Sequence, residues 1–224
     1  VKAGIKDILV IVSPDHAGNY LNLLGSLLES DGINVSFKVQ RSPRGLADAY
    51  LLAEDFLDNE PSVMILGDNI FQDDFTEAIT SFEKGGRVFA VKVPDPERFG
   101  VVEFHPEMQN VISIEEKPAA PKSDYANPGI YIFDGRACEI AKGLKPSSRG
   151  ELEIVDIHKA YLEQGELDVR ILEGAWFDTG THDSLLEASV FAKEAKLGEA
   201  FAPILNEAIL EHNKEIKRHV ALKQ

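Results

Sequence analysis

Hydrophobic residues in the first third of the chain form short runs, and these runs alternate with segments in which apolar residues recur at helical spacing. Asp7–Val12 and Ser62–Leu66 are apolar runs typical of buried strands, and residues 35–40 alternate as a half-buried strand does. Leucines at helical spacing over residues 21–28, and the amphipathic stretch 46–56, predict two helices. The order strand, helix, strand, helix, strand is typical of an α/β fold whose sheet is mixed, mostly parallel and flanked by helices.

The rest of the chain continues this pattern without a repeat, a low-complexity tract or a long linker. We therefore predict one α/β domain over residues 1–198 and a helical tail over residues 199–224. The predicted strands are 88–93, 101–104, 111–114 and 130–133, and the predicted helices are 137–143, 152–164, 183–196 and 204–217.

The net charge limits the ligands that the protein is expected to bind, and the cysteine content indicates its cellular compartment. The formal net charge of the 224 residues is −15, which disfavours nonspecific binding to nucleic acid or anionic membrane. A phosphorylated ligand would therefore need a local cluster of Lys, Arg, backbone N–H groups or metal ions. The single cysteine, Cys138, excludes an internal disulfide and a cysteine-based zinc site, and it predicts a reducing, cytoplasmic location and a buried thiol. The six histidines have no metal-ligand spacing and are interpreted as surface or capping residues.

Two aspartates follow apolar strand segments at widely separated points of the sequence. Asp68 ends the most apolar strand, and Asp178 follows an aromatic strand end before a Gly/Thr turn. Carboxylates are the ligands that Mg²⁺ prefers, and two of them at strand ends could hold one ion. A helix or turn cap is the competing interpretation of each.

The segment from Gln40 to Gly45 lies between a predicted strand and a predicted helix. A glutamine amide both donates and accepts, as contact with a pyrimidine edge requires, and a glycine lets the backbone approach a flat ring. A simple turn around Pro43 and Gly45 explains the segment equally well.

A third set of candidates combines charge with glycine. Lys117 and Arg149 could supply a point charge and a forked donor to one phosphate, and Glu116 could accept hydrogen bonds from sugar hydroxyls. Gly100 and Gly129 offer backbone contact to a sugar ring. Taken singly, the charges could equally be solvated surface groups, and the glycines could be tight turns.

The order of these segments resembles the glucose-1-phosphate thymidylyltransferases of the sugar nucleotidyltransferase family, from about Ala3 to about Ala195. The motifs that carry the resemblance are Leu66-Gly67-Asp68-Asn69, Phe99-Gly100-Val101-Val102-Glu103-Phe104, Ile114-Glu115-Glu116-Lys117-Pro118, Asn127-Pro128-Gly129-Ile130-Tyr131, Arg149-Gly150-Glu151-Leu152-Glu153-Ile154 and Trp176-Phe177-Asp178-Thr179-Gly180-Thr181.

The resemblance implies a Rossmann-like nucleotidyltransferase fold and transfer of a nucleotidyl group from dTTP to glucose-1-phosphate, with release of pyrophosphate. It also implies Mg²⁺ as cofactor, a homo-oligomer, specifically a tetramer, and a role in nucleotide-sugar and polysaccharide biosynthesis. The implied roles are nucleotide binding by Gln40, Pro43, Gly45 and Asp68, magnesium binding by Asp68 and Asp178, glucose contact by Gly100, Glu116 and Gly129, and phosphate binding by Lys117 and Arg149.

Two departures from the family pattern bear on these expectations. Family members begin with a strand and a glycine-rich loop that grips the triphosphate, and no segment here matches that loop. We therefore expect the chain to be incomplete at its N-terminus, and the catalytic Arg and Lys to lie upstream of residue 1. Residues 204–224 match no part of the family pattern.

Three other functions share part of this sequence pattern. A uridylyltransferase that uses UTP differs from the first hypothesis by one methyl group on the base and a 2′-hydroxyl on the ribose, which the sequence does not resolve. A non-catalytic paralogue that binds sugar phosphate is a second alternative. A nicotinamide-dependent dehydrogenase requires a Gly-x-Gly-x-x-Gly loop after a strand, which the sequence lacks.

Overall fold

The computed structural model describes residues 3–24, 33–105, 107 and 110–196. The chain divides into two compact units. One comprises Ala3–Arg41 and the chain from Leu186 onward, and the other comprises Ser42–Leu185. The helix predicted over residues 204–217, the tail 199–224 and the end of the helix predicted over 21–28 lie outside the described residues.

The first unit contains two parallel strands joined through a helix. β1 (Asp7–Val12) pairs with β2 (Asn34–Val39) in register along the full length of both strands, and α1 (Ala17–Leu24) lies between them in sequence. The side-chain amide of Asn34 donates to the Asp7 carboxylate over 2.8 Å, which fixes the first pair of the register. Both predicted strands and their parallel pairing are confirmed.

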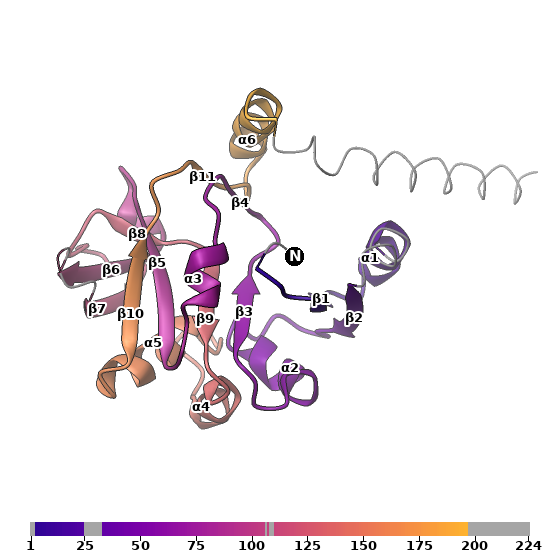
Figure 1. Cartoon of the computed structure of the whole chain (residues 1–224), viewed down its shortest axis with the longest axis horizontal. Coiled ribbons are helices and arrows are strands. Elements are labelled where there is room, and N and C mark those ends of the chain that lie inside the picture. Colours follow the sequence, from indigo (N-terminus) through magenta and orange to yellow (C-terminus); the bar gives the residue numbers. More distant parts are fainter. Residues whose placement is uncertain (1–2, 25–32, 106, 108–109, 197–224) are drawn as a thin grey trace, which may run out of the picture. The chain divides into compact units, whose positions relative to one another are not determined.

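The second unit is built on a seven-stranded mixed sheet in the order β10-β7-β6-β8-β5-β9-β3, in which β10 also pairs with β5. Figure 1 shows β10, β5, β9 and β3 side by side, with α3 in front of β9. The strands are β3 (Ser62–Ile65), β5 (Gly86–Lys92), β6 (Gly100–His105), β7 (Asn110–Glu116), β8 (Tyr125–Asn127), β9 (Ile130–Phe133) and β10 (Leu167–Ile171).

The mixed character of this sheet is confirmed, but its strand directions differ from the expectation of a mostly parallel sheet. Among the described pairings of this sheet, only β10 with β5 is parallel. The antiparallel pairs are β3 with β9, β5 with β9 and β8, β6 with β7 and β8, and β10 with β7. The β-α-β-α-β pattern predicts the elements correctly, but hydrophobic periodicity does not encode which strand becomes the neighbour of β3. That neighbour is β9, which lies far along the chain.

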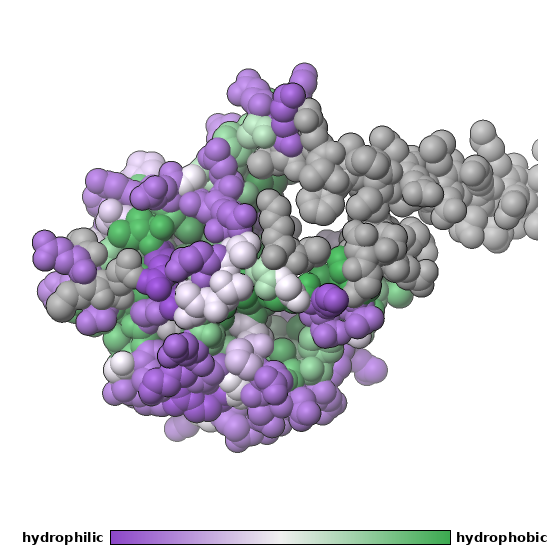
Figure 2. Space-filling view, in the orientation of Figure 1, coloured by the Kyte–Doolittle hydropathy of each residue, from purple (hydrophilic) through white to green (hydrophobic). Residues whose placement is uncertain are grey.

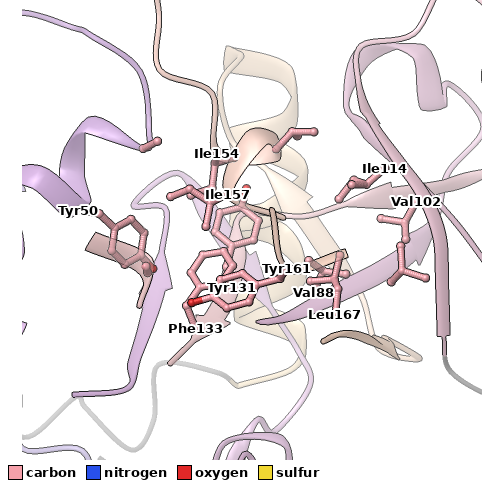
Figure 3. Packing of buried hydrophobic residues seen from close by; sticks show 14 of the residues in the cluster. Tyr50, Val88, Val102, Ile114, Tyr131, Phe133, Ile154, Ile157, Tyr161 and Leu167 are labelled. Carbon is pink, nitrogen blue, oxygen red and sulfur yellow. The ribbon is translucent and has the colours of Figure 1, made fainter. Parts of the chain in front are cut away.

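Alternation of side chains along β9 divides the core of this unit into two clusters. Tyr131 and Phe133 pack with residues of α2 (Asp48–Leu57), α4 (Ala137–Gly143) and α5 (Ile154–Glu163), whereas Ile130 and Ile132 pack with Ala78 of α3 (Thr76–Thr80). Successive residues of a strand point to opposite faces, so one strand serves both clusters. Figure 3 shows Tyr50, Phe133 and Tyr161 together in the larger cluster.

His158 corrects one prediction, and Cys138 confirms another. His158, on α5, is fully buried between the rings of Tyr131 and Phe133, with centroid separations of 5.0 Å and 5.3 Å, so it is neither a surface nor a capping residue. Its position on the apolar face of the helix is the cause. The Cys138 thiol is buried on α4 as predicted, and burial raises its pKa.

Hydrophilic residues cover much of the face seen in Figure 2, with smaller apolar areas between them. Within the part of the chain that the structure describes, no helix has the length and apolar character to cross a bilayer. The short elements β4 (Asn69–Phe71), β11 (Trp176–Asp178) and the 3-10 helix η2 (Pro96–Arg98), together with the 13-residue helix α6 (His182–Glu194), complete the described structure.

Candidate active site

A cleft of about 270 Å³ opens in the second unit where several strands end. Seven of the ten predicted site residues line it, although they come from separate segments of the sequence. The structure therefore brings together two carboxylates, two cations, one further acid and two glycines. These seven residues are Asp68, Gly100, Glu116, Lys117, Gly129, Arg149 and Asp178.

Asp68 and Asp178 are brought together by a two-stranded antiparallel sheet. β4 pairs with β11 so that Asp178 is opposite Asn69, the residue after Asp68. Thr179 adds two hydrogen bonds, because its backbone N–H and its hydroxyl both donate to the Asp68 carbonyl over 2.8 Å. Figure 1 shows β4 and β11 side by side. The two carboxylates thus enter one cleft from adjacent strands, as the sequence predicted from their positions.

Asn69 organises this end of the cleft, and its role was not predicted from the sequence. Its Nδ2 donates to the Asp68 carboxylate over 2.8 Å, and its Oδ1 accepts from the Trp176 indole over 2.6 Å and from the Gly129 N–H over 3.3 Å. A Cβ at position 129 would lie 2.7 Å from Asn69 Nδ2 and 2.8 Å from Leu66, so this position requires glycine. The only sequence signal for Asn69 was its place directly after Asp68.

The opposite wall of the cleft is formed where β6 begins and β7 ends. Gly100 is the register partner of Glu116, and a Cβ on Gly100 would lie 3.2 Å from Glu116 Oε2. The next residue, Lys117, has a left-handed backbone with φ +44°, held by its N–H donating to the Phe99 carbonyl over 3.0 Å. The left-handed residue ends the strand and places a lysine at the edge of the cleft.

Burial and charge act in opposite directions on Glu116. Desolvation raises the pKa of its carboxyl group, although Lys117 and Arg149 favour the charged form and oppose that rise. Glu116 is therefore a half-buried acid held between two cations. Such a group accepts hydrogen bonds well and is suited to bind hydroxyl groups.

Arg149 is surrounded by carboxylates. Its guanidinium makes two hydrogen bonds to Glu153, of 2.7 Å and 3.2 Å, and lies 3.6 Å from Glu151 and 3.9 Å from Glu116. Hydrogen bonds from Arg149 and from the Ser147 hydroxyl lower the pKa of Glu153, although its partial burial opposes this effect. The arginine is thus held firmly in place, and the acids around it already balance its charge.

The three residues predicted to bind the nucleotide base are placed differently. Pro43 is exposed, and neither Pro43 nor Gly45 is among the residues that line the cleft. Gly45 has φ +99°, and a Cβ there would lie 2.3 Å from the Leu152 carbonyl oxygen, so packing of the backbone already explains this glycine. Gln40 belongs to the other compact unit, where its N–H donates to the Val12 carbonyl over 2.9 Å. Their roles in base binding stay predictions.

The described residues include no group of three or more His, Cys, Asp or Glu side chains that could hold a metal ion. A metal in this cleft would therefore have two protein carboxylates, Asp68 and Asp178, and would complete its shell with water and ligand oxygens. Two carboxylates with phosphate oxygens form a donor set that suits Mg²⁺ better than it suits Zn²⁺, which is usually bound by nitrogen or sulfur ligands as well.

Comparison with known proteins gives consistent results. The nucleotidyl transferase family matches residues 1–195. A glucose-1-phosphate thymidylyltransferase of Neisseria meningitidis serogroup A is 51% identical over 198 residues, which are 85% of this chain and 68% of that protein. One from Mycolicibacterium smegmatis is 44% identical over 88% of this chain and 69% of its own length. The chain spans about two thirds of these relatives.

Solved structures agree. A candidate glucose-1-phosphate thymidylyltransferase from Bacillus anthracis, in complex with a sucrose, is 43% identical with a TM-score of 0.78, covering 85% of this chain and 78% of that one. A UDP-glucose pyrophosphorylase, 21% identical with a TM-score of 0.74 over 87% of this chain and 83% of its own, shares the fold. The predicted fold and family are confirmed, and the chain belongs to the nucleotidyl transferase family, alongside its glucose-1-phosphate thymidylyltransferases.

Proposed function

We propose that the protein transfers the thymidylyl group of dTTP to glucose-1-phosphate, forming dTDP-glucose and releasing pyrophosphate. The observation that carries this proposal is the identity of 51% to a named glucose-1-phosphate thymidylyltransferase, over a segment that includes every residue of the cleft. A phosphate oxygen of the sugar phosphate attacks the α-phosphorus of dTTP. A new P–O bond forms, the bond to the β-phosphate oxygen breaks, and pyrophosphate leaves.

The chain's own residues have positioning and electrostatic roles in this reaction. Lys117 and Arg149 bind the phosphate of glucose-1-phosphate, and Glu116 accepts hydrogen bonds from the sugar hydroxyls. Gly100 and Gly129 are proposed to contact the sugar ring through their backbones, and a Cβ at either position would press on residues that line the cleft, Glu116 or Asn69 and Leu66. Phosphoryl transfer of this kind depends mainly on alignment and charge neutralisation, and no covalent enzyme intermediate is required.

Asp68 and Asp178 would hold Mg²⁺ in this proposal. The ion supplies neutralisation of phosphate charge when it is bound. The hydrogen bond from Asn69 orients Asp68, and the β4–β11 pairing sets the position of Asp178 beside it. Gln40, Pro43 and Gly45 are proposed to contact the thymine, and a homo-oligomer is proposed for the assembled enzyme.

The test of the proposed activity is pyrophosphate release by the full-length protein with Mg²⁺, glucose-1-phosphate and either dTTP or UTP. We expect turnover with dTTP and a kcat/KM for UTP that is lower by roughly tenfold or more, because one methyl group gives about 10-fold to 200-fold discrimination. Equal or better turnover with UTP would identify a uridylyltransferase. Binding of glucose-1-phosphate without any turnover would instead support a non-catalytic paralogue.

The proposed magnesium ligands are tested with Asp178→Asn and Asp68→Asn, which remove a negative charge and keep the shape of the side chain. We expect each variant to lose roughly 100-fold or more in kcat, because the charge that positions the ion on the phosphates is removed. Their melting temperatures should stay close to that of the wild type. Asp183→Asn, in the first turn of α6 and outside the cleft, is the control. Wild-type turnover by Asp178→Asn would contradict the assignment.

A further inference from the structure

Arg98 is a third cation that lines the cleft, besides Lys117 and Arg149. It is the last residue of η2, and one residue, Phe99, separates it from the strand β6, which begins at Gly100. Its side chain is more than half exposed. A cation in the wall of a cleft that is proposed to bind two phosphorylated substrates is a candidate for contact with one of them.

Neighbouring groups hold the Arg98 side chain in a defined position. Its Nη1 donates to the Asp95 carboxylate over 2.7 Å, and its guanidinium carbon lies 5.2 Å from the centre of the Phe99 ring. The Phe99 ring packs edge-on against Trp176 at 5.2 Å, and Trp176 is held by Asn69. These contacts fix the guanidinium before any ligand binds, which lowers the entropy lost on binding.

The charges around Arg98 differ from those around Arg149. Arg149 lies within 4.0 Å of three carboxylates that line the cleft. In the described part of the chain, Arg98 has one carboxylate within that distance, Asp95, which does not line the cleft. The positive charge of Arg98 is therefore less neutralised by nearby carboxylates than that of Arg149, and it is more available to a phosphate.

The charge of Asp178, one of the two proposed metal ligands, acts on Arg98. The hydrogen bond to Asp95, and then the negative charge of Asp178, raise the pKa of the Arg98 guanidinium. Arg98 thus lies within electrostatic reach of one of the two aspartates proposed to hold Mg²⁺. Phosphate oxygens would lie near an ion held there, and Arg98 lines the same cleft as both aspartates, so its guanidinium is well placed to donate to those oxygens.

A purely structural role for Arg98 would be to stabilise the turn at 95–98 through Asp95. That role uses one of the five N–H donors of the guanidinium. It does not explain the position of the side chain in the cleft wall, where its remaining donors can reach a ligand.

We propose that Arg98 is a substrate-binding residue whose guanidinium donates hydrogen bonds to a phosphate oxygen of a substrate in the cleft. The proposal rests on the proposed function. The shared ligand chemistry is a phosphate oxyanion, and its two sources are glucose-1-phosphate and the nucleotide with its leaving pyrophosphate.

The experiment is steady-state kinetics of Arg98→Gln and Arg98→Lys in the full-length protein, in both directions of the reaction. Arg98→Gln should raise KM about tenfold for the substrate that Arg98 contacts, which corresponds to the loss of one charge-assisted hydrogen bond. Arg98→Lys keeps the positive charge but loses the paired N–H donors of the guanidinium, so its KM should lie between that of the wild type and that of Arg98→Gln. The effect should diminish at high ionic strength, because the site is open to solvent.

The substrates whose KM changes in Arg98→Gln show which of the two phosphate sources Arg98 contacts. A rise in KM for glucose-1-phosphate and dTDP-glucose alone identifies the sugar phosphate as the ligand. A rise for dTTP and pyrophosphate identifies the nucleotide phosphates. Either result supports the proposal.

Two control variants separate binding from the other effects of losing an arginine. Asp95→Asn removes the carboxylate partner but keeps the guanidinium, and Lys159→Gln removes an exposed cation of α5 outside the cleft. Lys159→Gln should leave every KM within about twofold of the wild type, the range expected of exposed ion pairs. Asp95→Asn loosens the guanidinium but keeps its charge, so it should raise the KM clearly less than Arg98→Gln does.

Three results would overturn the proposal: unchanged KM values in Arg98→Gln, the same KM changes in Asp95→Asn, or a change confined to the Mg²⁺ concentration required. Absence of turnover in the wild-type protein would be a failure of the proposed function instead. Binding of inorganic pyrophosphate and glucose-1-phosphate by calorimetry then tests Arg98 independently, and equal affinities in wild type and Arg98→Gln would reject it.

Discussion

Gly45 shows how one residue supports the cleft without lining it. Its backbone has φ +99°, and its α-carbon packs on the backbone of Leu152, which lies between Glu151 and Glu153. Two hydrogen bonds hold this contact, from Leu152 N–H to the Arg44 carbonyl over 2.7 Å and from Ala47 N–H to the Leu152 carbonyl over 3.1 Å. The segment that holds Arg149 is thus attached to the start of α2.

We predict that Gly45→Ala destabilises the protein by about 2 kcal/mol or more. A left-handed backbone costs a residue with a Cβ about 1–2 kcal/mol, and the close contact with Leu152 adds an overpacking cost of about 1–3 kcal/mol. Urea unfolding measures the loss. Gly143→Ala is the matched control, because a Cβ there has no atom within 4 Å, and it should cause no loss. Equal stability of Gly45→Ala and wild type would contradict the close contact.

For single residues, the sequence predicted the charged side chains that line the cleft better than the hydrogen bonds and ion pairs that hold them in place. Asp68, Asp178, Glu116, Lys117 and Arg149, which were selected from their places after strands or before a helix, all line one cleft. The role of Asn69 and the ion pairs of Arg149 with Glu151 and Glu153 were not predicted. Two partners of Asn69 lie 60 and 107 positions away along the sequence, and hydrophobic periodicity does not contain this information.

Among the elements, helix α5 carries a buried group that makes stability depend on pH. His158 packs between Tyr131 and Phe133, and neither ring nitrogen has a hydrogen-bond partner among the described residues. Burial lowers its pKa to about 3, so the folded protein holds it neutral. The unfolded chain takes up a proton below the ordinary histidine pKa of about 6.5. The stability from neutral His158 is therefore full above pH 6.5 and is lost as the pH falls towards 3.

We predict that His158→Met reduces this pH dependence. Between pH 7 and pH 5 the wild type should lose about 2 kcal/mol more free energy of unfolding than the variant, from roughly 1.4 kcal/mol per pH unit below 6.5. Methionine has a similar volume and carries no titrating group. Urea unfolding at several pH values measures the difference, and His182→Met, at an exposed position on α6, should follow the wild type. Parallel profiles for His158→Met and wild type would exclude His158 as the cause.

The elements that the sequence predicted are those with a strong hydrophobic period. The strands β1, β2, β3, β5, β6, β7 and β9 and the helices α2, α4, α5 and α6 lie within a few residues of their predicted positions. The short strands β4, β8 and β11 have three residues each, too few to establish a period, and they form because a partner strand is present. β4 and β11 are nevertheless the pair that brings Asp68 and Asp178 together, so the decisive local geometry was the hardest to predict.

For the whole molecule, the order of the motifs was more informative than the pattern of strands. The hydrophobic pattern suggested a mostly parallel sheet, whereas the pairing of β3 with β9 is antiparallel. The resemblance of six ordered motifs identified the family, which the match over residues 1–195 confirms. The predicted domain boundary at residue 198 stays a prediction.

The charge of the whole molecule leads to a last prediction about substrate association. The protein has a formal net charge of −15, and the cleft itself has five carboxylates against three cations. A sugar phosphate therefore approaches against repulsion, both from a distance and at the cleft. Salt shortens the Debye length from about 30 Å at 0.01 M to about 8 Å at 0.15 M, so it removes the long-range part of this repulsion first.

Without Mg²⁺, we expect the association rate constant of glucose-1-phosphate to rise as NaCl increases from about 0.01 M to 0.15 M. Stopped-flow binding measures it. This direction is opposite to that of a basic, phosphate-attracting surface, for which salt slows association. With Mg²⁺ bound at the proposed Asp68 and Asp178 site, two positive charges would balance the formal excess of carboxylates in the cleft, so the salt dependence should become smaller. An association rate that falls with salt in the absence of Mg²⁺ would show that Arg98, Lys117 and Arg149 outweigh the acids around them.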